Sequence, residues 1–341
     1  MSKKVAKITK KAKETPRSPS GSPRKVVAFS PRTTEMRSSI SEYYSSRPDF
    51  LPTSISFFYF IGRLNPPHNG HIAALHSLII MARGDHSFPL ILLGNGPQSK
   101  SCSKDQQTTN KLDNPIDFEL KKEFIQYKLL TQYGIHPTTY LIVEMGSPAK
   151  QVSNYITFTL EQPGLTKNIN EVKIYHVAGD KDGDTTKLDF IKPIARGSVT
   201  NILSQLERIV TETIGIPAIT EGTEEMSATK VRLSIYEGVL KENPGIFMEK
   251  YGEFYGDYAD RIYDTIARVG QEVRPERLIE YINCKDPSVA LGIKNKSRRR
   301  EKRENRYRLS KKPKRQTTGL RHELRQRSRQ RHRKTKKKIT K

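Results

Sequence analysis

Two histidines three positions apart are the side chains in this sequence best suited to act on a phosphate group. His68 and His71 belong to the run His68-Asn69-Gly70-His71, which follows an apolar segment and opens a segment of helical period. Imidazole N–H groups at the start of a helix can stabilise the charge that grows on phosphate oxygens under nucleophilic attack. Gly70 has no side chain to keep a ligand away from the main-chain N–H groups there. The spacing predicts that both rings can face one phosphate.

The residues before this run favour a functional interpretation. A single histidine is more often a packing or surface residue, and the short pattern alone is only moderately specific. Here Gly62-Arg63 and the pair Pro66-Pro67 stand between a strand-like apolar run and the histidines. Gly62 would let the backbone approach a ligand at the carboxyl end of a strand, where open α/β sheets bind their substrates. We therefore expect a ligand-binding loop between Gly62 and His71.

A second segment with phosphate-binding residue types follows about 160 positions later. Met226-Ser227-Ala228-Thr229-Lys230-Val231-Arg232 opens another segment of helical period. Ser227 and Thr229 are suited to cap a helix and to hydrogen-bond phosphate oxygens, and Arg232 returns to the same end of that helix one turn later. An ordinary capped helix with a solvated arginine would look the same. Taken alone, the segment favours that simpler interpretation.

Together, the two segments resemble the nucleotidylyltransferase superfamily, which combines an HxGH motif after the first strand with an (I/M)SxTxxR motif before a late helix. The sequence of the first motif is most similar to that of archaeal-type nicotinamide mononucleotide adenylyltransferases, which begin GRFxPxHxGH where this chain has Gly62 to His71. That family also has a loop of the kind GSAQ…NPF…ER, which Gly94-Asn95-Gly96-Pro97-Gln98 and Asn114-Pro115-Ile116 match in order. Glu119-Leu120 departs from it, because the family has Arg after this Glu.

The resemblance implies transfer of AMP from ATP to a phosphorylated acceptor, which for this family is nicotinamide mononucleotide and gives NAD and pyrophosphate. It implies that His68 and His71 hold the α-phosphate, and Mg²⁺ would bridge phosphate oxygens without a dedicated protein site. The resemblance implies these further contacts: Arg63 and Arg232 to the triphosphate, Ser227 and Thr229 to the departing pyrophosphate, Gly62 and Gly70 in the nucleotide-binding loop, and Gln98, Asn114, Gly179 and Asp180 to the acceptor or ribose.

Other functions remain open at this point. The motifs specify the chemistry better than the substrate, so the enzyme could use CTP or another phosphorylated small molecule. A nucleic-acid-binding protein with a non-catalytic nucleotidylyltransferase scaffold belongs to a different class, but the two motifs are complete, which speaks against it. Class I aminoacyl-tRNA synthetases share HxGH-like chemistry, yet Met226 to Lys230 matches their KMSKS signature poorly.

The pattern of apolar residues predicts an α/β fold in which a Rossmann-like parallel sheet is covered by helices on both faces. Short apolar runs predict strands, and longer segments of helical period predict helices between them. Asn114 and Pro115 are typical of a helix start, and the stretch from Gly94 to Asp113 of a polar loop. We expect strands at Ile55–Ile61, Phe88–Leu93, Tyr140–Glu144, Val172–Ala178 and Ile216–Ile219, and helices at Gly70–Met81, Asn114–Tyr133, Val199–Ile214 and from Ser227 to about Asn283.

Charge divides the chain into three parts, and the middle part is expected to have two subdivisions. Residues 1–50 hold 12 Lys and Arg against 4 Asp and Glu, and residues 294–341 hold 24 against 3. These ends have few large apolar residues and predict disordered basic arms that bind nucleic acid or another polyanion through charge alone. Residues 51–293 hold 25 basic and 29 acidic residues. We expect residues 51–240 to form the nucleotidylyltransferase domain and 241–293 a helical cap of it.

The cysteine count and the lengths of the apolar runs bear on where the protein is located. Cys102 and Cys284 are the only cysteines, which are too few for a disulfide framework and give no paired zinc-ligand spacing, so an intracellular, reducing location is the simplest interpretation. No apolar run approaches the ~20 residues needed to cross a bilayer. We expect a soluble protein of the cytoplasm or nucleus with no membrane partner. Whether it forms a homo-oligomer stays open.

Overall fold

A five-stranded sheet with all strands parallel lies at the centre of the structure. The computed structural model describes residues 30–94, 102, 105–179, 188–216 and 226–289. The strand order is β3-β2-β1-β4-β5, so the chain moves outward from β1 to one edge and then to the other. The expected Rossmann-like α/β fold is confirmed. The strands are β1 (Ser54–Gly62), β2 (Leu90–Leu93), β3 (Leu141–Glu144), β4 (Glu171–Gly179) and β5 (Arg208–Ile216).

The central strand is mostly apolar because both of its faces are buried. Phe58 and Phe60 pack into one hydrophobic cluster, whereas Phe57 and Tyr59 pack into another. Successive strand side chains point to opposite faces, so a strand covered on both sides reads as a continuous apolar run. The apolar run at β1 therefore predicts a strand that is covered on both faces.

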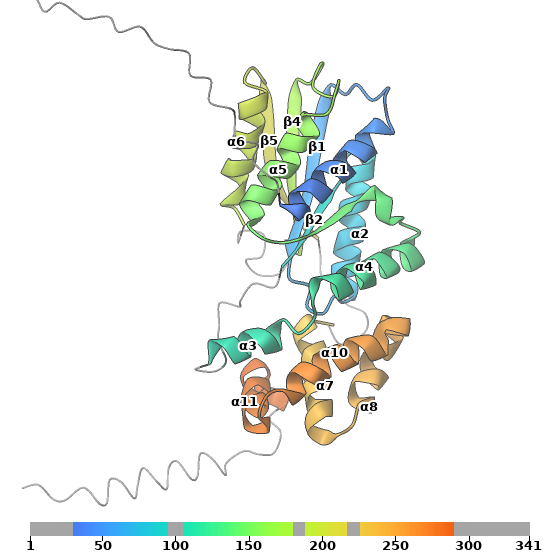
Figure 1. Ribbon diagram of the computed structural model, residues 1–341, viewed down its shortest axis with the longest axis vertical. Helices are drawn as coiled ribbons and strands as arrows, with labels where there is room; N and C mark the ends of the chain where they lie inside the picture. The colour runs from blue at the N-terminus through green and yellow to red at the C-terminus, as the bar shows by residue number, and fades with distance from the viewer. Residues whose placement is uncertain (1–29, 95–101, 103–104, 180–187, 217–225, 290–341) are drawn as a thin grey trace, which may run out of the picture.

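Helices cover the two faces of the sheet. Helices α1 (Pro31–Ser45), α5 (Pro148–Leu160) and α6 (Ile191–Ile202) lie against one face, while α2 (Asn69–Gly84) and α4 (Phe118–Tyr133) lie on the other (Figure 1). Each parallel crossover thus places a helix on the sheet, as this topology requires.

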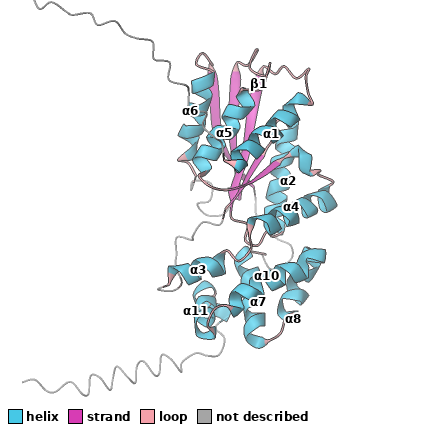
Figure 2. Ribbon diagram, viewed as in Figure 1, coloured by secondary structure: helices cyan, strands magenta, loops and turns pink. Residues whose placement is uncertain are grey.

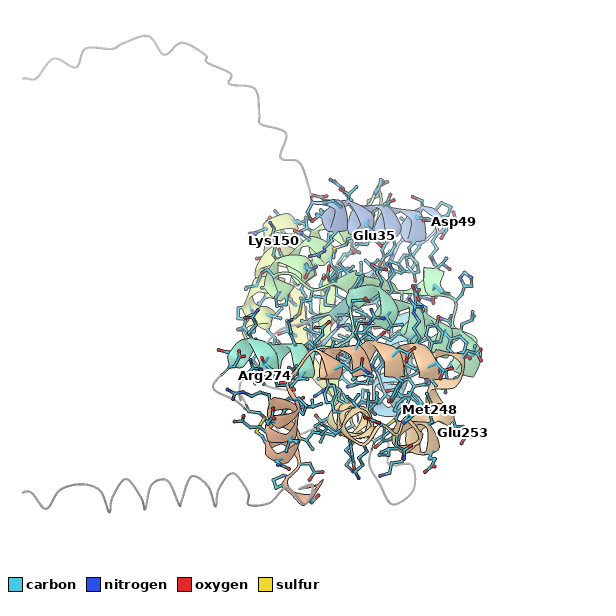
Figure 3. All side chains as sticks on the ribbon, turned by 60° about the horizontal axis from the view of Figure 1, so that its bottom comes forward. Glu35, Asp49, Lys150, Met248, Glu253 and Arg274 are labelled. Atoms are coloured by element: carbon cyan, nitrogen blue, oxygen red, sulfur yellow. A yellow bond between two sulfur atoms is a disulfide. The ribbon has the colours of Figure 1, made fainter. Side chains whose placement is uncertain are left out.

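The remaining helices gather beyond one end of the sheet, where Figure 2 shows no strands. They contact the segment after β1, since the Tyr255 hydroxyl donates to the Pro67 carbonyl at 2.8 Å. They therefore lie at the carboxyl end of β1. Figure 3 shows Met248 and Glu253 of this layer on the opposite side of the molecule from Glu35 of α1. The elements of this layer are α3 (Gln106–Asp113), α7 (Ala228–Lys241), α8 (Gly245–Phe247), the π-helix Met248–Gly252, α9 (Glu253–Tyr255), α10 (Ala259–Gln271) and α11 (Pro275–Lys285).

Helix α1 corrects the expectation that residues 1–50 form a disordered arm. Ser30 caps this helix, and Met36, Ile40 and Tyr44 are buried in the cluster beneath it. Their spacing of four residues places them on one face of the helix, which is the face that docks onto the sheet. Most other residues of the helix are polar, so the three apolar positions did not stand out in the sequence. Residues 1–29 and 290–341, which hold the rest of the expected arms, lie outside the described residues.

Three other expectations about elements were wrong. The stretch Gly94–Asp113 contains α3, and Asn114 ends that helix instead of starting the next one. Helix α4 begins at Phe118, where the Asp117 carboxylate accepts from the Leu120 N–H at 2.9 Å. The expected helix Val199–Ile214 covers the end of α6 and most of strand β5. Of the expected strand Ile216–Ile219, Ile216 is the last residue of β5, and residues 217–219 lie outside the described residues. Helix α5 was not expected.

A buried histidine in β4 predicts how the fold responds to acid. His176 is 1% exposed and stacks on Tyr59, with ring centroids 5.2 Å apart. Neither of its ring nitrogens has a hydrogen-bond partner among the described residues. Burial, together with the charge of Lys192, lowers the pKa of His176 from 6.5 to about 4. Protonation would place an unpaired charge inside the sheet.

We therefore expect stability to fall as the pH falls from 6.5 to 4, because in that window the unfolded chain binds a proton that folded His176 does not. The loss attributable to this residue is on the order of 3 kcal/mol and is complete below pH ~4. His176→Leu should flatten the dependence of the unfolding free energy on pH over this window in denaturant titrations. His86→Asn, which removes an exposed histidine, is the matched control. An unchanged slope in His176→Leu would refute this account.

Candidate functional site

The loop after β1 is shaped by close contacts within the chain. The Gly62 carbonyl accepts from the Gly94 N–H at 2.9 Å, which ties the ends of β1 and β2 together. A Cβ atom on Gly62 would lie 2.6 Å from a ring carbon of Phe60. Glycine is therefore required here by the packing of the chain itself. Within the loop, the peptide bond between Asn65 and Pro66 is cis.

His68 and His71 come together at the start of α2. Their ring centroids are 3.6 Å apart, and the His71 Nδ1 accepts from the main-chain N–H of His68 at 3.3 Å. Because Nδ1 is the acceptor, the proton of a neutral His71 ring lies on Nε2, which is then a donor. His68 is buried and precedes the first helical residue, and His71 is half-buried. A Cβ on Gly70 would lie 3.3 Å from the His68 ring, so Gly70 leaves room for that ring.

The helix start adds a positive electrostatic contribution to this pair. No acidic residue occupies the first turn of α2, and the only basic residue near its far end is Arg83. The unpaired N–H groups and the dipole at a helix N-terminus favour anions. The His71 Nε2–H and the first turn of α2 can therefore act on the same negative group.

The second motif packs against this loop. Arg232, on α7, is 3% exposed and donates from Nη1 to the Asn65 carbonyl, 167 positions away in the chain. The Ser227 hydroxyl caps α7 by accepting from the Lys230 N–H at 3.2 Å, and the Thr229 hydroxyl lies 3.3 Å from Arg232 Nη2. Ser227 and Thr229 therefore both have local structural roles. The Arg232 guanidinium is held inside the protein, contrary to the solvated arginine of an ordinary helix.

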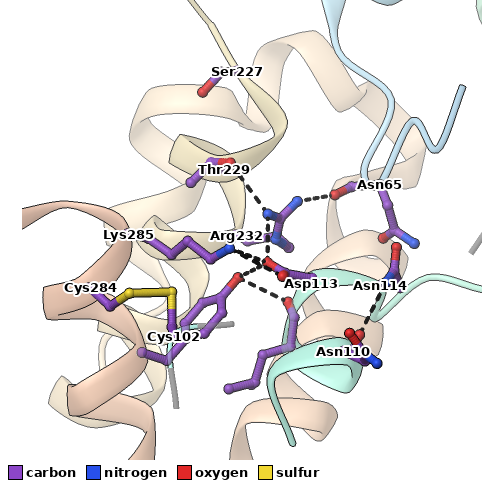
Figure 4. A network of polar contacts seen from close by, with 12 residues as sticks. Asn65, Cys102, Asn110, Asp113, Asn114, Ser227, Thr229, Arg232, Cys284 and Lys285 are labelled. Carbon is purple, nitrogen blue, oxygen red and sulfur yellow. Dashed lines mark hydrogen bonds and ion pairs between the residues drawn. A yellow bond between two sulfur atoms is a disulfide. The ribbon is translucent and has the colours of Figure 1, made fainter. Parts of the chain in front are cut away.

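Arg232 takes part in a buried ionic network around Asp113, the last residue of α3. Its Nη2 lies 3.4 Å from the Asp113 carboxylate, and the Lys285 Nζ lies 3.1 Å from the same group. The Tyr281 hydroxyl donates to Asp113 Oδ1 at 2.6 Å (Figure 4). Among the described residues, one buried carboxylate thus faces two cations, which gives this part of the structure an excess of positive charge close to the β1–α2 loop. The Nε of Arg232 is buried and has no hydrogen-bond partner among the residues that the structure describes.

Asn65 is a residue that sequence reasoning missed. Its side-chain amide donates to the Ile116 carbonyl at 2.9 Å, and its amide oxygen accepts from the Ile116 N–H at 3.1 Å. This two-way contact fixes the loop after β1 to the segment before α4. With Arg232 on its carbonyl, Asn65 joins three distant parts of the chain.

Lys121 of α4 was also missed. It is fully buried and donates to the carbonyls of Arg63 and Gly94, at 3.1 and 3.0 Å. Burial lowers its pKa to about 8. A lysine on the apolar face of a helix, between Leu120 and Phe124, was the sequence signal that could have identified it. It places a titratable amine at the carboxyl ends of β1 and β2.

The remaining expected site residues are spread more widely. Arg63 is half-buried in the β1–α2 loop. The Asn114 side chain donates to the Asn110 carbonyl at 3.1 Å as α3 ends. Gly179 is the last residue of β4, beside Ile216 of β5, and a Cβ there would meet no atom within 4 Å. Gln98 and Asp180 lie outside the described residues.

The two cysteines form a disulfide, although their number predicted no disulfide framework. Cys102 is bonded to Cys284 across a sequence separation of 182 residues. The bond lies beside the Asp113 network in Figure 4. Cysteine count alone could not predict it, because pairing depended on α11 returning to the segment that precedes α3.

Comparison with known proteins adds no functional assignment. No family model matches the chain, and no curated protein sequence matches it. Among solved structures, it is similar to a macrolide-efflux protein from Streptococcus pneumoniae, with 13% identity and a TM-score of 0.27. The match covers 59% of this chain and 57% of that structure's chain, and at this TM-score it carries no argument. No helix in the described ranges is long and apolar enough to cross a membrane.

Proposed function

We propose that this chain is a nucleotidylyltransferase that transfers AMP from ATP to a phosphorylated acceptor, with nicotinamide mononucleotide as the preferred acceptor. The observation that carries the proposal is the contact of Arg232 with Asn65, because it joins the two motif segments on which the resemblance rests. Two imidazoles, a helix N-terminus and a cationic network then surround one loop at the carboxyl end of β1. This is where α/β sheets of this kind bind nucleotides.

In the proposed reaction, a phosphate oxygen of the acceptor attacks the α-phosphorus of ATP. A bond forms between them, the bond from the α-phosphorus to the oxygen bridging to the β-phosphate breaks, and pyrophosphate leaves. His71 would donate from Nε2 to the α-phosphate, and the first turn of α2 would stabilise the same charge. His68 would position His71 through its main-chain N–H. Such a displacement depends mainly on alignment and neutralisation of charge.

Arg63 and Arg232 would supply positive charge toward the triphosphate. For Arg232 to touch a phosphate directly, its guanidinium would have to exchange part of its contact with Asp113 for the ligand. Ser227 and Thr229 would contribute hydroxyls near the departing pyrophosphate. Gly62 and Gly70 would shape the loop, and Gln98, Asn114, Gly179 and Asp180 are proposed to contact the acceptor or ribose.

Magnesium is expected with ATP, but these residues do not suit a protein-held ion. The side chains at the loop are imidazole and cationic groups, and the Asp113 carboxylate already faces Arg232 and Lys285. Within the described ranges, no group of three or more His, Cys, Asp or Glu side chains could hold a metal. Magnesium coordination prefers oxygen ligands. We assign no protein ligand to Mg²⁺ and derive no catalytic step from it.

A panel of acceptors tests the proposal. We expect pyrophosphate release from ATP with nicotinamide mononucleotide to exceed release with other phosphorylated acceptors, and ATP to exceed CTP as the nucleotide. Release is measured by a coupled phosphate assay, and the dinucleotide product by mass spectrometry. Higher activity with a different phosphorylated small molecule would support the proposed adenylyl transfer and would refute nicotinamide mononucleotide as the preferred acceptor. ATP binding without turnover on any acceptor would favour a non-catalytic scaffold.

The basic ends suggest nucleic acid as a further partner. Residues 294–341 hold 24 Lys and Arg against 3 Asp and Glu. Such a segment would bind through the release of counterions, so we expect affinity for duplex DNA or RNA to fall steeply between about 50 and 200 mM salt. Fluorescence anisotropy on the full chain and on a chain ending at residue 293 measures this. Equal affinity of the two chains would refute the assignment to this segment.

A further inference from the structure

The disulfide joins two parts of the chain that also meet in the Asp113 network. Cys102 lies between β2 and α3, and α3 ends at Asp113. Cys284 lies near the end of α11, next to Lys285. The covalent bond and the ionic contacts therefore hold the same two segments together, the first through sulfur and the second through the Asp113 carboxylate.

Without this bond, α11 would be held mainly by three buried side chains and its polar contacts. The helix has 11 residues, of which Leu278, Tyr281 and Ile282 are buried. Among the described residues, its polar attachments to the network are the Tyr281 hydroxyl, which contacts Asp113 and the Leu112 carbonyl, and the Lys285 amine, which contacts Asp113. Short peripheral helices with few buried side chains are the elements that open locally at low cost. The disulfide is therefore a covalent link at the end of a helix that has few other attachments among the described residues.

We propose that the Cys102–Cys284 disulfide is a redox-sensitive latch, which keeps α11 on Asp113 and thereby sets the charge available beside the proposed nucleotide loop. A dithiol opens the latch by donating two electrons and two protons. The sulfur–sulfur bond breaks, Cys102 and Cys284 become thiols, and the dithiol becomes a disulfide. The effect on the loop rests on the proposed function, whereas the release of α11 does not.

The direction of the effect follows from the charges around Asp113. In the closed state the Asp113 carboxylate is shared between Arg232 and Lys285, so the three described groups together carry one net positive charge. When α11 moves away, Lys285 and the Tyr281 hydroxyl leave with it, and Asp113 then neutralises Arg232 alone. The loop at Asn65 loses the excess charge, which weakens its attraction for a triphosphate. Reduction should therefore raise the KM for ATP and leave kcat nearly unchanged.

The experiment compares the full chain before and after treatment with dithiothreitol, alongside Cys102→Ser and Cys284→Ser. Hydrogen exchange followed by mass spectrometry reports α11, and initial rates report the KM for ATP. Reduction of the native chain should speed exchange in α11 by about tenfold and raise the KM by about fivefold. Both serine variants should show the α11 exchange and the KM of the reduced protein, and the dithiol should change neither. A Ser288→Ala chain, altered beyond α11, should respond like the native one.

Each outcome bears on one proposal. Two free thiols in the untreated chain, or α11 exchange that does not respond to reduction, would overturn the latch. Turnover with an unchanged KM after reduction would overturn its effect on the loop. Faster α11 exchange in a chain that releases no pyrophosphate in either state would support the latch as a device of the fold and overturn the proposed function.

Discussion

Replacing Asp113 with alanine should lower the free energy of unfolding by about 3–5 kcal/mol, the range seen when one partner of a buried ion pair is removed. The side chain of Asp113 is inaccessible to solvent, and that of Arg232 is 3% exposed. The substitution leaves Arg232 and Lys285 close together without a counter-charge and removes the acceptor of the Tyr281 hydroxyl. Denaturant unfolding followed by circular dichroism measures the loss.

Two variants separate the charge from the hydrogen bond. Tyr281→Phe removes one donor to the same carboxylate without changing any charge, and should cost about 1 kcal/mol. The double variant Asp113→Leu with Arg232→Met removes the pair together, and should be more stable than Asp113→Ala because less uncompensated charge remains. If Asp113→Ala stayed within about 1 kcal/mol of the native chain, the network would not be the buried ionic structure described here.

The fold could be predicted mainly where strands are buried on both faces. At β1, β2 and β3, short apolar runs mark the strands, and the structure has these strands within one or two residues of the expected bounds. Strand β5 was mistaken for part of a helix because it is a half-exposed edge strand, where polar and apolar residues mix. Its β-branched residues, such as Val210 and Ile214, were the signal for a strand. Edge position is a tertiary property that local sequence does not carry.

The site was predictable in its local parts and unpredictable in its partners. The position of His68 and His71 at a helix start followed from the sequence, because a short apolar run precedes them and an amphipathic helix follows. The ionic network around Arg232 could not be predicted from the sequence. Its other members, Asp113 and Lys285, lie 119 and 53 positions away from Arg232 and look like ordinary surface charges in the sequence. Which charges become buried depends on how α3, α7 and α11 pack, and that packing leaves no local pattern.

The proposed chemistry makes its largest demand on His71. If the His71 Nε2–H stabilises the charge on the α-phosphate, His71→Ala should lower kcat by about 10²–10³-fold, as loss of one oxyanion donor does elsewhere. The KM for ATP should change much less, because the interaction strengthens only in the transition state. Initial rates of pyrophosphate release with the best acceptor of the panel measure both constants.

The His71→Ala variant alone does not separate donation from Nε2 to the phosphate from the structural contact at Nδ1, because His71 Nδ1 also accepts from the His68 N–H. Two polar replacements separate the roles. Asparagine places its amide oxygen near the position of Nδ1, so His71→Asn should keep the contact with His68 and lose the donor. Glutamine reaches the position of Nε2, so His71→Gln should supply an N–H there and lose the contact. If Nε2 acts on the phosphate, Gln retains more activity than Asn, while Asn retains more stability. The reverse order of activities would mean that His71 serves only to hold the start of α2.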